Sequence, residues 1–226
     1  MNKHIYLLRG RGSEDYVSFR ERILQLSSEA SELPGISKLS VTITTEKPPV
    51  VSVIPFKKGK IAAVSVINEN HSPERFFYNQ PGFSGAYKVT EALPRSYVRD
   101  WPCGEVTPGV CLLTLFRRKK KITRDDYLHR WHNGHTPLTL KVHPVWHYNR
   151  NVVEEKLTDD TEGHEGIVEE HFLQRSHLLN PAKFFGNAVT MLPNMLRVYF
   201  DVNSFLDYKS TEPYLVREYH IKDTEG

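Results

Sequence analysis

The sequence predicts an α+β protein in which two successive βαββαβ units enclose a β-barrel. Two observations support this fold class. The same order of strands and helices occurs twice along the chain, and each unit leaves one face of its antiparallel sheet without a cover. Packing the two open faces together covers both. We therefore expect two ferredoxin-like halves, at residues 1–103 and 109–226, with closure either within one chain or across a homodimer.

The first half shows strand and helix patterns in the order that this fold requires. Ser13 is a candidate helix cap followed by acidic residues, and Pro34-Gly35 ends that helix. Ser72-Pro73-Glu74 has the pattern of a second helix start, with proline at the first helical position. Apolar or β-branched runs predict three strands, at residues 4–9, 36–45 and 61–67. A fourth strand is expected after the second helix.

The second half repeats this order after residue 109. Thr123 has the character of a helix N-cap, and Asp125 and Asp126 place negative charge in the first turn, where it is favoured. A longer helical region is expected at residues 181–208, with a break at Pro193. Apolar runs predict four strands, at residues 110–116, 145–153, 167–173 and 214–221.

Composition argues against several classes of protein. The 226 residues carry a formal net charge of +3, which is too small to indicate nucleic acid or a membrane surface as a partner. Two cysteines, Cys103 and Cys111, do not make a disulfide scaffold. No run approaches the roughly 20 apolar residues of a membrane span. The first residues lack the apolar core of a secretory signal, so we expect a cytoplasmic protein.

The first helix of the second half carries the most informative pattern. At 100° per residue, Tyr127, Trp131 and His135 fall on one apolar stripe, while His129 turns toward solvent. The helix is expected to weaken before Pro137, because proline disfavours helix at the preceding residue. His135 then has two interpretations. It is either a core histidine bonded to a carbonyl group, or a general acid–base group.

Three segments of the second half resemble a known family. They are Thr123-x-x-x-Tyr127-x-x-x-Trp131-x-x-x-His135-x-Pro137-Leu138 after a basic loop, Trp146-His147-Tyr148-Asn149 in the next strand, and Gly166-Ile167-Val168-Glu169 in the third. In this order they are similar to the EthD family of the dimeric α/β-barrel superfamily, over residues 110–221. His171 stands where the family usually has Trp. The first half matches only in layout, so one functional site per chain is expected.

The resemblance implies a pocket between helix and sheet or inside the barrel. Members of the superfamily include cofactor-free monooxygenases, lactone isomerases, polyketide cyclases and haem enzymes. We therefore expect a small hydrophobic or aromatic carbonyl compound as the ligand, and a lyase, isomerase or monooxygenase that uses no cofactor. His135 is the expected acid–base group, since histidine titrates near neutral pH.

The predicted strand that follows this helix offers two alternative sets of site residues, because its side chains alternate between two faces. One face carries Trp146 and Tyr148, which would form aromatic walls of a pocket. The other face carries His147 as a rival general base, and Asn149 or Asn151 as a partner for an oxyanion. Only one of these two sets is expected to face the cavity.

Further candidates come from the helix and from the third strand. Tyr127 and Trp131 would add flat apolar walls to the pocket. Glu169, which has apolar neighbours on its strand, is a candidate either to orient His135 or to pair with a surface arginine. A purely structural role is the alternative for each of these residues.

Two other functions are open alternatives. A binding or stress-response protein would hold an apolar ligand without chemistry, and a haem-binding barrel would use a histidine as an iron ligand. A metal site is not expected, since the histidines between residues 129 and 147 form no His-Glu-x-x-His motif. The basic run at residues 117–121 is interpreted as a solvated loop, because no RNA-binding signature accompanies it.

Overall fold

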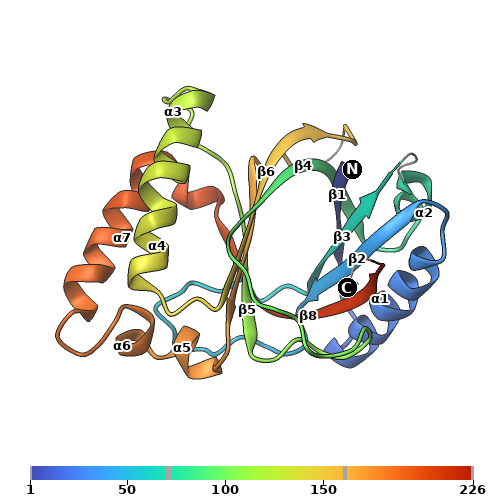
Figure 1. The fold of residues 1–226 in the computed structure, drawn as a ribbon, viewed down its shortest axis with the longest axis horizontal. Coiled ribbons are helices and arrows are strands. Elements are labelled where there is room, and N and C mark those ends of the chain that lie inside the picture. The colour runs from blue at the N-terminus through green and yellow to red at the C-terminus, as the bar shows by residue number, and fades with distance from the viewer. Residues whose placement is uncertain (1, 70–72, 160–161, 225–226) are drawn as a thin grey trace.

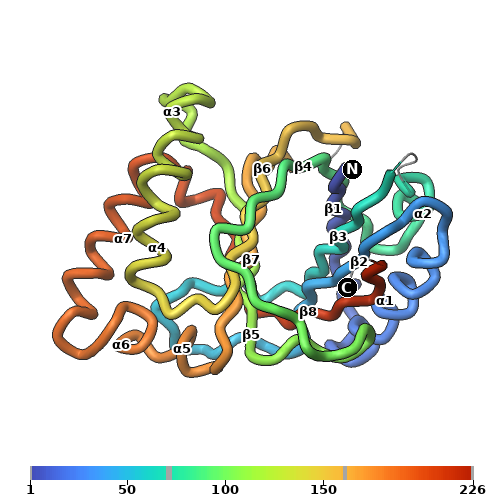
Figure 2. Tube along the Cα trace, viewed as in Figure 1, coloured from blue at the N-terminus to red at the C-terminus, as the bar shows by residue number. Residues whose placement is uncertain are grey.

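The computed structural model describes residues 2–69, 73–159 and 162–224. Its centre is a closed barrel of antiparallel strands in the order β1-β3-β2-β8-β5-β7-β6-β4, with helices on two sides (Figures 1 and 2). The strands are β1 (Asn2–Arg9), β2 (Ile36–Ile43), β3 (Ile61–Asn68), β4 (Phe83–Arg95), β5 (Val110–Phe116), β6 (His147–Lys156), β7 (Gly166–Phe172) and β8 (Glu212–Asp223). The barrel therefore closes within one chain.

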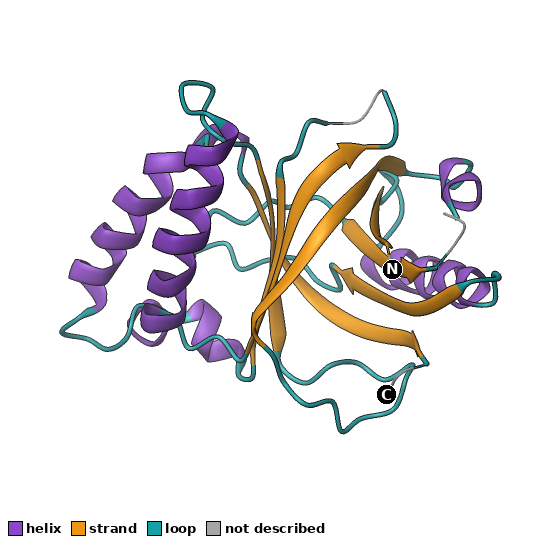
Figure 3. Ribbon diagram, turned by 45° about the horizontal axis from the view of Figure 1, so that its top comes forward, coloured by secondary structure: helices purple, strands orange, loops and turns teal. Residues whose placement is uncertain are grey.

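The helices form two separate groups, one on each side of the barrel (Figure 3). The first group is α1 (Tyr16–Ser31) and α2 (Glu74–Tyr78). The second group, which we name the helix layer, is α3 (Arg124–His129), the π-helical turn η1 (Arg130–His135), α4 (Thr136–Val142), α5 (Arg175–Leu179), α6 (Pro181–Phe184) and α7 (Met191–Phe205), followed by the 3-10 turn η2 (Tyr208–Ser210). Within the described ranges, none of these helices combines the length and the apolar character needed to span a bilayer.

Each half of the chain contributes four strands in the same spatial order. The first half gives β4-β1-β3-β2 and the second gives β8-β5-β7-β6, which is fourth, first, third, second in both. The two sets join where β2 pairs with β8 and where β4 pairs with β6. This arrangement confirms the predicted α+β fold class. The division of the chain into units near residues 103–109 stays a prediction.

Strand side chains alternate between the barrel lumen and the helices outside it. The lumen holds an apolar cluster around Leu113. The outer face of the first-half strands packs on α1, and Phe19 of α1 and Val64 of β3 belong to the same core cluster. The outer face of the second-half strands packs under the helix layer, where Trp131 and Phe205 are buried. The side chains of two consecutive residues on a strand therefore lie on opposite sides of the sheet, one in the lumen and one on the outer face.

The helix starts agree only in part with the predicted caps. Thr123 is confirmed as an N-cap, because its side chain accepts a hydrogen bond from the backbone N–H of Asp126. Ser13 is wrong as the cap of the first helix. Asp15 fills that role and accepts from the N–H groups of the second and third helical residues. Ser72 lies outside the described residues, and α2 begins at Glu74.

The predicted break at Pro193 is wrong. α7 runs from Met191 to Phe205 without interruption, so Pro193 lies in its first turn. The backbone N–H groups of a first turn have no acceptor within the helix, and a proline there sacrifices no hydrogen bond. The helical region divides earlier instead, between α6, which ends at Phe184, and the start of α7.

The helix also continues through Pro137, where the sequence predicted weakening. The π-helical turn η1 makes this continuation feasible. The N–H of Thr136 donates to the carbonyl of Trp131, five residues back, and the Thr136 hydroxyl donates to the same oxygen at 3.0 Å. Pro137, which has no N–H, then falls in the first turn of α4. The wider turn places His135 at the junction of the two helices.

Gly166 allows β7 to approach the helix layer closely. A Cβ atom at this position would overlap the ring of Phe116 and lie 2.9 Å from Cη2 of Trp131. We expect Gly166→Ala to lower the free energy of unfolding by about 1–3 kcal/mol, the usual cost of overpacking a core. Urea unfolding measures the change. Gly163→Ala is the matched control, since nothing lies within 4 Å of its Cβ position, and equal effects of the two substitutions would contradict the prediction.

Candidate functional site

A cavity of about 200 Å³ lies between the helix layer and the outer face of β5, β6 and β7, and we name it the helix-side cavity. Most of its lining is apolar, including Leu112, Phe116, Trp131, Val168, Phe205 and Leu206. Titratable groups suited to proton transfer also line it, namely His135, His143 and Glu170. His135 comes from the helix layer and Glu170 comes from β7, so the two groups reach the cavity from different walls.

His135 is held in place by two neighbours. Its Nδ1 lies 2.6 Å from Oδ2 of Asp201 on α7, and its Nε2 lies 3.2 Å from the hydroxyl of Thr139. Since a carboxylate accepts, we assign the ring proton to Nδ1, and Nε2 then accepts from the Thr139 hydroxyl. The carboxylate behind the ring both orients the imidazole and would stabilise its protonated form.

Glu170 is a buried carboxyl group with 8% of its surface exposed. Within the described part of the chain, no group makes a hydrogen bond to it. Burial raises the pKa of Glu170 from its ordinary value near 4.5 to about 7, and the positive form of His135 opposes that rise. The group therefore keeps its proton to nearly neutral pH, where it can donate a hydrogen bond into the helix-side cavity.

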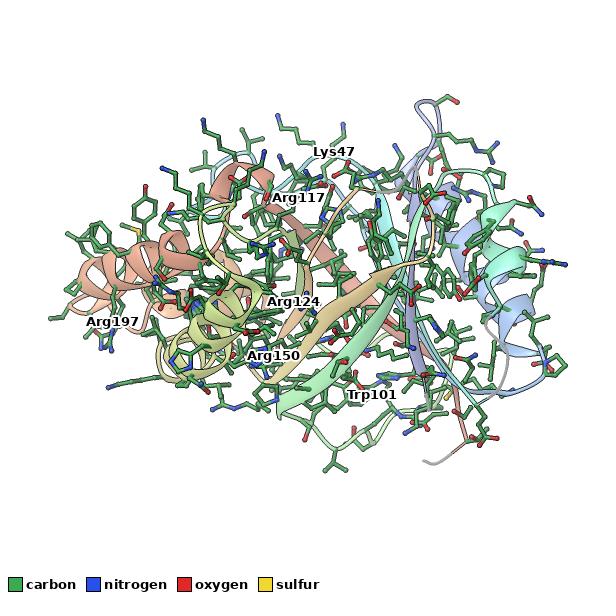
Figure 4. All side chains as sticks on the ribbon, turned by 90° about the horizontal axis from the view of Figure 1, so that it is seen from above. Lys47, Trp101, Arg117, Arg124, Arg150 and Arg197 are labelled. Atoms are coloured by element: carbon green, nitrogen blue, oxygen red, sulfur yellow. The ribbon has the colours of Figure 1, made fainter. Side chains whose placement is uncertain are left out.

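Aromatic side chains form much of the wall around these two groups. Trp131 and Tyr148, which the sequence analysis proposed as aromatic walls of a pocket, both line this cavity. The guanidinium of Arg150 lies 5.7 Å from the centre of the Trp131 ring and donates to the hydroxyl of Thr136 at 2.9 Å. Tyr127 lies behind this wall, fully buried, with its ring centre 5.4 Å from that of Trp131. Figure 4 shows Arg150 beside the helix layer.

The alternative set of predicted residues faces the barrel lumen. His147 and Asn149 line a second cavity there, and the buried Asn151 follows them at the next lumen position of β6. Glu169 also faces the lumen, where it accepts a hydrogen bond from the hydroxyl of Thr42 at 2.8 Å. The prediction that Glu169 orients His135 or pairs with a surface arginine is therefore wrong, because strand alternation turns it away from both.

Trp146 does not join Tyr148 on the cavity wall. It precedes β6, and its ring packs 4.8 Å from that of Tyr97 and 5.8 Å from that of Trp101, which come from the link after β4. Figure 4 shows Trp101 on the opposite side of the molecule from Arg117. Each of the two cavities is lined by one face of β6, since Tyr148 borders the helix-side cavity and His147 and Asn149 border the one in the lumen.

Two groups of the candidate site, Glu170 in the cavity wall and Asp201 behind His135, were not predicted from the sequence. Glu170 directly follows Glu169, and the alternation of a strand was a sufficient signal to consider both carboxyl groups. Asp201 is separated from His135 by 66 residues, so no local spacing links them. A weak signal was available for Asp201, because it is an acidic residue inside a largely apolar helix.

The helix-side cavity does not fit a haem group, and the one group of metal-ligating side chains found among the described residues is already paired with arginines. The helix-side cavity, at about 200 Å³, lies below the range of about 300–1,000 Å³ typical of pockets for drug-sized ligands, so a haem macrocycle does not fit there. Elsewhere in the described chain, ligand atoms of Glu162, His164 and Glu212 lie within 4.8 Å of one another. There Arg9 lies 3.2 Å from Glu212, and Arg117 lies 3.3 Å from Glu162. These guanidinium groups already neutralise the two carboxylates.

Comparison with known proteins identifies the fold. No protein-family model matches the chain, and no curated protein matches it. A solved structure described as an anthrone oxidase-like protein has a TM-score of 0.57 and 10% sequence identity, and the match covers 99% of this chain and 94% of that chain. The "Putative monooxygenase" of Fusobacterium nucleatum subsp. nucleatum has a TM-score of 0.52 and 6% identity, with 100% and 94% covered.

At these identities the likeness concerns the fold alone. The closed eight-strand barrel and its two groups of helices are of the dimeric α/β-barrel type, here within a single chain. The narrower resemblance to the EthD family stays a prediction.

Proposed function

We propose that this protein is an enzyme that oxidises a compact aromatic carbonyl compound with molecular oxygen in the helix-side cavity. One observation carries the proposal. His135, which Asp201 holds from behind, and the buried acid Glu170 line the same apolar cavity. A protein that only stores an apolar ligand needs no base and acid in its pocket, whereas proton transfer requires such groups.

The cavity favours a flat and compact ligand. Its volume of about 200 Å³ lies below the range of about 300–1,000 Å³ typical of pockets for drug-sized ligands. Trp131, Tyr148 and Phe205 offer ring faces and edges, against which an aromatic ligand packs favourably. The few polar groups among them would fix the orientation of the ligand rather than supply most of its affinity.

In the proposed mechanism His135 is the base and Glu170 the acid. The ligand directs its carbonyl oxygen toward Glu170, which donates a hydrogen bond as negative charge develops on that oxygen. Nε2 of His135 takes a proton from the acidified C–H group, and Asp201 stabilises the imidazolium that forms. The resulting carbanion is electron-rich enough to react with oxygen directly, so this chemistry requires no organic cofactor.

Anthrone is the substrate we choose for the test, because one protein of the same fold is described as anthrone oxidase-like. The central methylene carbon of anthrone loses a proton to His135 and forms a C–O bond with molecular oxygen. Loss of the second hydrogen from that carbon and cleavage of the O–O bond then release water and leave a carbonyl group. One anthrone and one oxygen molecule give one anthraquinone and one water molecule.

The resemblance to the EthD family supports the choice of this cavity. The Trp131-x-x-x-His135 pattern that carries the resemblance contributes two of its lining residues. A lyase or an isomerase would use the same proton transfer without consuming oxygen, and oxygen uptake therefore separates these reactions from a monooxygenase. We choose the oxygen-consuming reaction because the two similar structures named above carry oxidase or monooxygenase descriptions.

Replacing His135 by Gln removes the proposed base but keeps a hydrogen-bonding side chain. We expect kcat for anthrone oxidation to fall by about 10²–10⁴-fold, the usual contribution of a general base, with little change in anthrone binding. Oxygen uptake and anthraquinone absorbance measure kcat, and equilibrium dialysis measures the binding of anthrone.

His129→Gln is the matched control, because His129 lies exposed on α3, next to η1. This substitution should leave both kcat for anthrone oxidation and the binding of anthrone unchanged. Undiminished turnover in H135Q would contradict the assigned role of His135. Tight binding of anthrone by the wild-type protein without any product would instead indicate a binding protein.

The raised pKa of Glu170 makes stability depend on pH. The folded state keeps this proton up to about pH 7, whereas the unfolded chain loses it near 4.5, so stability falls as pH rises through that window. Glu170→Gln removes the titration. We expect its free energy of unfolding, relative to wild type, to increase by up to about 3 kcal/mol between pH 4.5 and 8.

Urea unfolding of both proteins across this pH range measures the difference. Glu155→Gln is the control, since Glu155 is an exposed glutamate of β6. Its difference from wild type should stay constant with pH. A constant difference for E170Q as well would show that Glu170 ionises normally, and it would remove the acid from the proposed mechanism.

A further inference from the structure

The lumen contains a second cavity that the proposed function does not use. It measures about 460 Å³ and lies on the lumen face of β6, and we name it the lumen cavity. Ser65, Glu91, His147 and Asn149 line it from three different strands, and Tyr97 from the link after β4 lines its rim. Deeper in the barrel, the apolar cluster described above fills the lumen.

Several buried polar atoms in this part of the lumen have no hydrogen-bond partner. Among the described residues they are Oγ of Ser65, Nδ1 of His147 and Oδ1 of Asn149 in the lining, and Oδ1 of Asn151 and Nε2 of His171 on the adjoining lumen positions. All five side chains are at least nine-tenths buried. Buried polar groups normally find partners, because an unpaired group is destabilising. Because five such atoms lie in or beside one cavity, we expect a polar ligand there that forms the missing hydrogen bonds.

The unpaired amide atoms are acceptors. Nδ2 of Asn149 donates to Glu91 at 2.8 Å, and Nδ2 of Asn151 donates to the carbonyl of Ile167 at 3.2 Å, so both amide oxygens are left over. Burial lowers the pKa of His147 to about 4, and its ring is therefore neutral at pH 7. A ligand that satisfies these atoms must bring hydrogen-bond donors, and hydroxyl groups also accept in return.

Three charged residues that line the lumen cavity, Lys3, Glu91 and Glu218, already have partners. Nζ of Lys3 pairs with Glu91 at 2.5 Å. Glu218 accepts from the hydroxyl of Tyr97 at 2.7 Å and from that of Thr107 at 2.8 Å. His171 and His220, together with the hydroxyl of Tyr97, hold the pKa of Glu218 well below its usual range in spite of its burial. An ionic ligand would compete with existing pairs, whereas a neutral ligand would not.

We propose that the lumen cavity is a second binding site, for a small neutral compound that carries two or more hydroxyl groups. Polyols and polyphenols share this chemistry. Phloroglucinol, a flat aromatic triol, and myo-inositol, an aliphatic ring polyol, are probes that distinguish the two sources. The rim ring of Tyr97 suits either of them, through ring stacking or through C–H contacts.

Isothermal titration calorimetry of each probe against the full chain tests the proposal. We expect one site per chain for at least one probe, and Ser65→Ala should weaken its binding by about three- to tenfold, the value of one neutral hydrogen bond. Ser65→Val adds bulk inside the cavity and should weaken binding further. Since Oγ of Ser65 has no partner among the described residues, S65A should fold as well as wild type.

Ser27→Ala is the matched control. Ser27 on α1 is also fully buried with an unpartnered hydroxyl, but it lies outside the lumen. Binding that weakens in S65A and S65V but not in S27A or H135Q supports the proposal, and the probe that binds identifies the source. Binding that is lost in H135Q but unchanged in S65A would place the probe in the helix-side cavity and overturn it. No binding of either probe at millimolar concentration would also overturn it, with water filling the lumen.

Discussion

Closure of eight antiparallel strands into one ring of hydrogen bonds is the constraint on which the rest of the structure depends. The β2–β8 and β4–β6 pairings join two four-stranded sheets and leave neither with an open edge. Because side chains alternate along a strand, closure assigns every residue to the lumen or to the outer face. Glu169 and Glu170 show the consequence. They are neighbours in sequence, yet one bonds to Thr42 inside the barrel and the other faces the helix-side cavity.

The two cavities separated by this sheet differ in chemistry. The helix-side cavity is mostly apolar, and its desolvation keeps a proton on Glu170 while Asp201 supports His135. The lumen cavity is polar, and its charges are paired, as Lys3 with Glu91 shows. A base and an acid beside aromatic walls suit proton transfer to and from a flat carbonyl compound. Unpaired neutral acceptors suit a ligand with hydroxyl groups.

Local patterns were sufficient to predict much of the fold and part of the site. The stripe of Tyr127, Trp131 and His135 follows from helical periodicity alone, and the structure places the last two on the cavity wall. The continuation of the helix through Pro137 could not be predicted, because it depends on one π-helical turn. Asp201 could not be linked to His135 either, since only tertiary packing of α7 brings the two together.

Strand alternation predicted two alternative sets of site residues, one on each face of β6. It did not show which face the helix layer covers. In the structure, both faces border a cavity. The orientation of Trp146 could not be predicted from strand alternation either. It precedes the first paired residue of β6, so the alternation of the strand does not govern it, and its ring packs on Tyr97 and Trp101 from a distant link.

The most direct test of the account is a crystal structure of this protein with anthraquinone, the product of the proposed reaction. We predict that the ligand lies in the helix-side cavity, packed on Trp131, with one carbonyl oxygen within hydrogen-bond distance of Glu170 and its reacting carbon next to Nε2 of His135. Anthraquinone bound only in the lumen, or outside both cavities, would contradict the assignment of His135 and Glu170 as the reacting pair.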